Sequence, residues 1–235
     1  MARLETLRGR NKLSDTIYEE MESAIIRGIF KPGEKVYEDE VAAQLGTSTT
    51  PVREAIARLC QEGLLETGFY KTPTVIRLTP KKVKDIFEVR EVLEGLAVRL
   101  AIQKPITPTE LEQLRGTQEL AERSLSRGDL AGYFESNESF HWALVDLTEN
   151  EILIASMRKI RRLVRLLAYN TMQLPGRPER SIEQHLRLIE AMKRGDATTA
   201  ETLMRDHIAE AKDIMLDKIR QLAASEDVKP ESRAE

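Results

Sequence analysis

The chain has 235 residues, a net charge of −3, 41% hydrophobic and 32% charged residues. This length fits two domains that each bury a core, and the composition is ordinary for a soluble helical protein. The single cysteine excludes an internal disulfide. No apolar run approaches the ~20 residues that cross a bilayer, and no signal peptide opens the chain. We therefore expect a cytoplasmic protein with no membrane partner.

The N-terminal third predicts a helix-turn-helix. A basic stretch over residues 1–12 is expected to be a mobile arm that becomes ordered on DNA. Gly46 predicts a left-handed helix end, because it lacks the Cβ that makes this conformation costly. Thr49 or Thr50 is the expected N-cap of the next helix, with Pro51 as its first helical residue. The predicted helices cover about 14–27, 38–45 and 50–62.

Two short strands are predicted after these helices, over 64–67 and 74–78, with residues 68–73 as a wing between them. A helix-turn-helix of this kind points the N-terminus of its second helix outward. Exposed N–H groups and the positive end of the helix dipole then suit phosphate oxygens and base edges in a major groove. The side chains expected at this tip are Ser48, Thr49, Thr50 and Arg53.

The charge of this region bears on how it would bind DNA. Residues 1–79 carry nearly balanced charges, and only the arm is clearly basic. Because non-specific affinity depends on the number of phosphates neutralised, we expect it to be weak and strongly salt-dependent. Specific binding then requires two copies of the domain, which predicts a homodimer on a pseudo-palindromic operator.

The residues Pro51-Val52-Arg53-Glu54-Ala55, followed by Gly63-Leu64, resemble the winged helix-turn-helix of the GntR superfamily of bacterial transcription regulators. The resemblance covers about 12–78. It implies that the helix beginning near Thr50 reads operator DNA and that the wing contacts the minor groove. This chain has Thr49 where the family usually has Arg, so the operator sequence of close relatives is not carried over. The DNA-binding residues expected are Ser48, Thr49, Thr50, Arg53, Arg58, Tyr70, Lys71, Arg10 and Lys12.

A second domain of amphipathic helices is predicted beyond Thr79, which can cap the helix that follows Pro80. The predicted helices lie near 81–103, 108–126, 128–147, 151–173, 178–194 and 196–222. Their number and length indicate an antiparallel bundle of about six helices. The protein is therefore expected to be mainly α, with domains at 1–79 and 80–223 and a disordered tail at 224–235.

The protein has three histidines, and each lies on the apolar stripe of a different predicted helix. His141, His185 and His207 should all point into the bundle, where an unsatisfied polar group costs a few kcal/mol. Asn137 lies one turn before His141 on the same helix face. One interpretation is a divalent metal bound by three imidazoles and one side-chain oxygen. The alternative is three histidines that are hydrogen-bonded separately in the core.

The pattern Asn137-Glu-Ser-Phe-His141, with Glu183-Gln-His185-Leu186 and Asp206-His207, resembles the FCD effector domain of the FadR-type branch of GntR regulators. The resemblance covers 81–222 and implies that Asn137, His141, His185 and His207 bind a metal. The family usually has Asp at the first position, so Asn137 removes one negative charge. Imidazole ligands suit Zn, Ni, Fe and Mn, and zinc is favoured.

Arg90 lies on the apolar stripe of the first bundle helix, where a guanidinium needs an anionic partner. That partner is either an internal carboxylate such as Glu94 or Glu138, or a small carboxylate effector held between Arg90 and the metal. The predicted function is a ligand-responsive, DNA-binding transcription regulator, nucleoid-associated when bound to DNA, and not an enzyme. The alternative function is a metal-dependent hydrolase housed in the bundle.

Overall fold

The computed structural model describes residues 11–68, 71–171 and 176–226. The chain divides into two compact units, Met1–Leu78 and Thr79–Glu235. Within the described residues, no helix combines the length and the hydropathy needed to cross a membrane.

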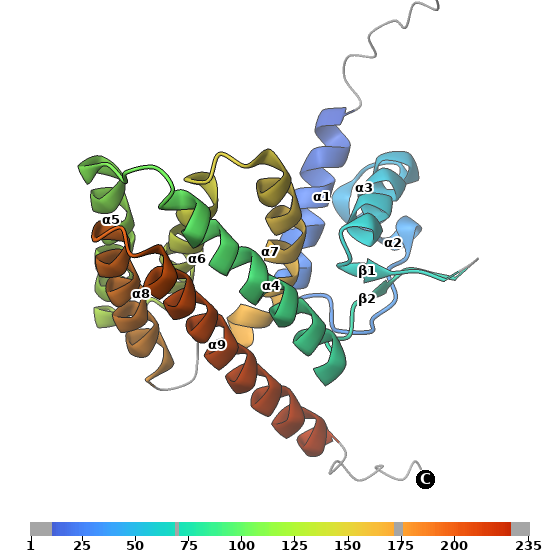
Figure 1. Ribbon diagram of the computed structural model, residues 1–235. Helices are drawn as coiled ribbons and strands as arrows, with labels where there is room; N and C mark the ends of the chain where they lie inside the picture. The colour runs from blue at the N-terminus through green and yellow to red at the C-terminus, as the bar shows by residue number, and fades with distance from the viewer. Residues whose placement is uncertain (1–10, 69–70, 172–175, 227–235) are drawn as a thin grey trace, which may run out of the picture. The chain divides into compact units, whose positions relative to one another are not determined.

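The first unit is a helix-turn-helix with a small hairpin, as predicted (Figure 1). The helices α1 and α2 both pack against α3 around the buried side chains of Met21, Val41 and Leu59. Gly46 ends α2 in the left-handed conformation, with φ of 63°. The elements are α1 (Asn11–Ile26), α2 (Glu38–Leu45), α3 (Thr49–Gln61), β1 (Leu65–Glu66) and β2 (Thr74–Val75).

The predicted start of α3 was wrong by one or two residues. Ser48 is the N-cap and Thr49 the first helical residue, so Pro51 is the third rather than the first. Proline is tolerated there because the N–H groups of the whole first turn lack an intrahelical acceptor.

The strands are shorter than predicted. Pairing between them ends where Ile76 N–H donates to the Leu64 carbonyl (3.0 Å), because Leu64 already closes the end of α3 through its own N–H. The other edge of β2 pairs with residues 34–36, a contact that the sequence analysis missed: Val75 N–H donates to the Glu34 carbonyl at 2.9 Å.

The second unit is a bundle of six helices, which confirms the predicted fold class. Thr79 caps the first helix by accepting from the Lys82 N–H at 3.2 Å, as expected. The last helix continues to Glu226, so the first residues of the expected tail, 224–226, are helical, and the rest of the tail lies outside the described residues. The helices are α4 (Pro80–Ala101), α5 (Pro108–Ser126), α6 (Leu130–Asp146), α7 (Glu151–Thr171), α8 (Arg177–Lys193) and α9 (Ala197–Glu226).

The helices α4 and α9 lie side by side along much of their length, and α5 packs against both α6 and α8 (Figure 1). One apolar cluster joins α4, α6 and α7 through Ala97, Val145 and Met157. Another joins α5, α6 and α8 through Ala121, Tyr133 and Ile182. The second cluster holds α6 near α8, and α9 packs against α4 and α8. The three histidines lie on α6, α8 and α9.

Candidate metal centre and DNA-binding helix

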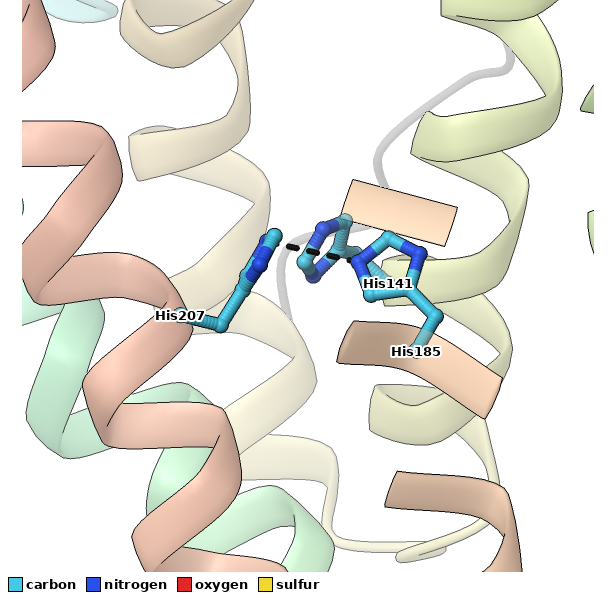
Figure 2. Close-up of side chains that lie close together, drawn as sticks. All are labelled: His141, His185 and His207. Atoms are coloured by element: carbon cyan, nitrogen blue, oxygen red, sulfur yellow. Dashed lines mark hydrogen bonds between the residues drawn. The ribbon is translucent and has the colours of Figure 1, made fainter. Parts of the chain in front are cut away.

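The three histidines meet inside the bundle, as the sequence predicted (Figure 2). His141 comes from α6, His185 from α8 and His207 from α9, and all three side chains are buried. One ring nitrogen of each residue lies within 4.8 Å of the others. This arrangement can hold a metal ion.

Each imidazole is oriented by an oxygen that accepts from its Nδ1–H. The partners are Glu94 Oε2 for His141 (2.6 Å), Gln118 Oε1 for His185 (3.0 Å) and Gln184 Oε1 for His207 (2.8 Å). Carboxylate and amide oxygens only accept, so the proton of each neutral ring lies on Nδ1. Every Nε2 therefore presents a lone pair, and such outer partners are typical of metal-binding histidines.

The Nε2 atoms fit a cation better than they fit one another. His185 Nε2 and His207 Nε2 lie 3.3 Å apart, the contact marked by the dashed line in Figure 2. With both rings protonated on Nδ1, this contact sets two lone pairs against each other. Two nitrogens bound tetrahedrally to zinc at about 2.0–2.1 Å would be separated by roughly the same distance. His141 Nε2 is buried without a hydrogen-bond partner in the described structure, which leaves it available as the third ligand.

The environment also keeps two of these rings, His185 and His207, neutral. Burial is the largest cause, followed by the charges of neighbouring rings and arginines, and together they lower the pKa values of His185 and His207 well below the ordinary range. A neutral imidazole is the form that binds a metal. These observations favour a shared metal site over three separately satisfied core histidines.

A small pocket, with a cavity volume of about 50 Å³, opens beside this centre. His141, His207 and the half-buried Asn137 line it, so Asn137 lies at the site where the sequence placed it. Arg90 and Arg177 line the same pocket. The metal position and two guanidinium groups thus face one enclosed space.

Arg90 has an internal partner, one of the two alternatives left open. Its Nε donates to Glu94 Oε1 at 2.5 Å, and both side chains are buried. Glu94 therefore bridges Arg90 and His141. Burial alone would raise the pKa of Glu94, but the charge of Arg90, then that of His141, and hydrogen bonds to both lower it to about 2. Glu138, the other candidate partner, pairs instead with Arg161 at 3.0 Å.

Sequence reasoning missed three residues of this site, Gln118, Gln184 and Arg177, and it did not predict that Glu94 bridges Arg90 and His141. Gln118 lies on an apolar helix face with Leu114 and Ala121 and is 1% exposed, so a polar residue on that stripe was the available signal. Gln184 and Arg177 lie two helical turns apart on α8, but nothing in that spacing distinguishes them from solvent-exposed polar residues.

Replacing Glu94 by Gln is expected to weaken zinc binding by about 10–100-fold, the usual effect of losing an outer partner of a metal-binding histidine. Glutamine still accepts from His141 Nδ1–H but lacks the negative charge. Zinc affinity is measured by chelator competition, with helical content and thermal unfolding of the metal-free protein as checks on folding. Glu138→Gln is the matched control, because it removes a buried carboxylate that contacts no histidine. Equal zinc affinities in the two variants would contradict the prediction.

The N-terminus of α3 is open, as expected for a DNA-reading helix. Ser48 makes no side-chain capping hydrogen bond, so no side chain occupies the N–H groups of the first turn. Ser48, Thr50 and Arg53 are exposed, and Thr49 is half-buried. Arg53 donates to Glu38 Oε2 from both Nε and Nη2 at 2.8 Å. DNA contact by Arg53 stays a prediction, and it would require the guanidinium to exchange this carboxylate for DNA.

The remaining residues predicted to bind DNA differ in their surroundings. Arg58 donates to Asp15 at 2.9 Å and lies 3.9 Å from the Tyr18 ring, contacts that brace α1 against α3. Lys71 is exposed beside the wing. Lys12 falls within α1 rather than in the expected mobile arm. Arg10 and Tyr70 lie outside the described residues. DNA contacts by all of these residues stay predictions.

An open recognition helix in one unit and a ligand-binding bundle in the other together define a DNA-binding transcription regulator. Comparison with known proteins gives the family. The FCD domain matches residues 85–210, and the family described as bacterial regulatory proteins, gntR family, matches residues 13–68. The chain belongs to the GntR family and carries an FCD domain.

Individual relatives agree with this assignment. The chain is 34% identical to the Nta operon transcriptional regulator of Aminobacter aminovorans, over 81% of this chain and 89% of that protein. It is 32% identical to the probable D-xylose utilization operon transcriptional repressor of Paenarthrobacter nicotinovorans, over 79% and 80%. The solved structure of E. coli McbR/YncC is 25% identical, with a TM-score of 0.72 over 88% of this chain and 98% of that one. The relatives are transcription regulators and not enzymes, which sets aside the hydrolase alternative.

Proposed function

We propose that this GntR-family regulator binds a pseudo-palindromic operator as a homodimer and responds to a small carboxylate bound beside a metal ion in the bundle. The observation that carries the proposal is the meeting of three buried imidazoles beside a pocket that His141 and His207 line together with two arginines. Operator binding implies that the protein works in the cytoplasm, on DNA.

His141, His185 and His207 would hold the metal, with Asn137 as a neutral oxygen donor from the same pocket wall. The resemblance to the FadR-type branch and the donor set favour zinc, while Ni, Fe and Mn remain compatible with imidazole. When bound, the metal supplies a Lewis-acidic position for an effector carboxylate. The chain itself keeps His185 and His207 neutral, orients all three rings through Glu94, Gln118 and Gln184, and places guanidinium groups around the pocket.

Regulation requires that the effector bind differently to the DNA-competent and DNA-incompetent arrangements of the dimer. A coupling free energy of about 1–3 kcal/mol changes operator affinity by about 5–150-fold. Glu94 links the pocket to the candidate metal centre, because its carboxylate contacts both Arg90 and His141.

Genomic selection of DNA fragments by the purified full-length protein tests the proposal. Zinc-loaded protein is expected to enrich fragments that share a pseudo-palindromic site, and the neighbouring genes then indicate the class of acid. The selection is repeated with chelator, which is expected to alter the response of binding to that acid. Enrichment of fragments without any common site would contradict operator recognition. An acid that saturates the pocket without changing operator affinity would contradict the regulatory step.

A further inference from the structure

Arg90 and Arg177, the two arginines of the pocket, have similar contacts but differ in the charge of the residue that each one contacts. Each guanidinium is separated from a metal-binding histidine by one side chain: Arg90 through Glu94 to His141, and Arg177 through Gln184 to His207. In the first chain of contacts the intermediate is a carboxylate. In the second it is a neutral amide.

The positive charge of Arg177 is therefore less well neutralised than that of Arg90. Its Nη1 lies 3.4 Å from Gln184 Oε1, a long contact to an oxygen that also accepts from His207 at 2.8 Å. Glu210 contributes a negative charge nearby, but it is paired with Arg180 at 2.5 Å and accepts from Gln184 Nε2 at 2.8 Å. In the part of the chain that the structure describes, no carboxylate forms an ion pair with Arg177.

Burial increases the free-energy cost of a guanidinium charge that no carboxylate neutralises. Burial is the largest cause that lowers the pKa of Arg177, and the positive charges of Arg90 and Arg180 act in the same direction. A guanidinium stays protonated in proteins, so it cannot relieve the cost by losing a proton. An anion that enters the pocket would relieve it.

We infer that Arg177 is a principal anion-binding residue of the pocket and that the effector carries two carboxylates, one on the metal beside Arg90 and the other on Arg177. The inference rests on the proposed function and narrows its effector class. The hydroxyl groups of Tyr133 and Ser181 line the same wall and can hydrogen-bond the second carboxylate. Because Arg90, Arg177, His141 and His207 line the same pocket, the inferred diacid is a short one.

The test compares the binding of matched acids by zinc-loaded, full-length protein. Propionate, butyrate and pentanoate are titrated beside malonate, succinate and glutarate, with calorimetry and thermal shift as readouts. At least one diacid is expected to bind about 10–100-fold more tightly than the monoacid of equal chain length, the size of one charge-assisted contact. In Arg177→Gln this advantage is expected to fall below about threefold.

Arg180→Gln is the matched control, because Arg180 lies on the same helix but is 63% exposed and paired outside the pocket. It should keep the diacid preference. Zinc affinity and helical content are measured for Arg177→Gln beside the acid titrations, which separates loss of the anion site from loss of the metal or of the fold.

Two results would overturn the inference: equal affinity for monoacids and diacids in the unmodified protein, or a diacid preference that survives in Arg177→Gln. Monoacids that bind as tightly as the diacids, and only in the presence of zinc, would leave the proposed function intact while refuting the inference of a diacid effector. If neither class of acid binds, the carboxylate-responsive function itself fails as well.

Discussion

A His185→Ala variant is expected to lose zinc affinity by on the order of 100–1000-fold, the largest effect that we predict in the bundle. Zinc binding in protein sites is worth about 10–16 kcal/mol shared among four ligands, so removal of one ligand costs several kcal/mol. His185 also sets the 3.3 Å Nε2 separation from His207, so its loss leaves a ligand pair without the tetrahedral spacing.

Thermal unfolding gives an independent measure of the same effect. At a zinc concentration of about 100 times Kd, bound metal adds about 2.7 kcal/mol to the free energy of unfolding. For a chain of this size that corresponds to a Tm increase of roughly 5–10 °C, which chelator should remove. In His185→Ala the Tm should be the same with and without zinc. Ser181→Ala is the control, since Ser181 is buried on the same helix and belongs to none of the three imidazole contacts. A zinc-dependent increase in Tm that persists in His185→Ala would contradict the assigned ligand.

The second large effect is expected for Arg53→Ala, which should weaken operator binding by about 30–1000-fold. An arginine that contacts a base edge contributes about 1–3 kcal/mol, and the contact occurs twice in a dimer. If Arg53 contacts phosphate instead, the slope of log affinity against log salt should fall by about one for each copy. Fluorescence anisotropy on a selected operator, repeated at several salt concentrations, distinguishes these two cases.

A substitution of Glu38 tests the same contact and is expected to change operator affinity in the opposite direction. Because Glu38 holds Arg53 at 2.8 Å in the free protein, Glu38→Gln should release the guanidinium. Exposed ion pairs contribute only about 0–1 kcal/mol, so operator affinity should rise by a few-fold at most. Arg99→Ala is the control for loss of a positive charge, since Arg99 is 63% exposed on α4 in the other unit. Equal losses of affinity in Arg53→Ala and Arg99→Ala would indicate a general charge effect and contradict a contact by the tip of α3.

The sequence by itself determined the fold class and the imidazoles of the metal centre. Apolar periodicity placed the helices of the bundle to within a few residues, because each helix must bury one face whatever its neighbours are. The three histidines could be placed for the same reason: an imidazole on a buried stripe has few places to point, and His141, His185 and His207 occupy three such stripes. The helix end at Gly46 could also be predicted locally, because it depends only on the backbone conformation of that residue.

The tertiary structure determined which side chains pair with one another in the bundle. The sequence left Arg90 open between Glu94, Glu138 and an effector, because all of these partners are compatible with its helix face. The pair that formed, Arg90 with Glu94, is local to α4, and packing between helices placed His141 on the same carboxylate and gave Glu138 to Arg161. Gln118 and Arg177 became part of the site for the same reason, through contacts between residues distant in the chain. Hydrogen bonds and ion pairs depend on distances of a few ångström between separate helices, and a one-dimensional pattern does not contain those distances.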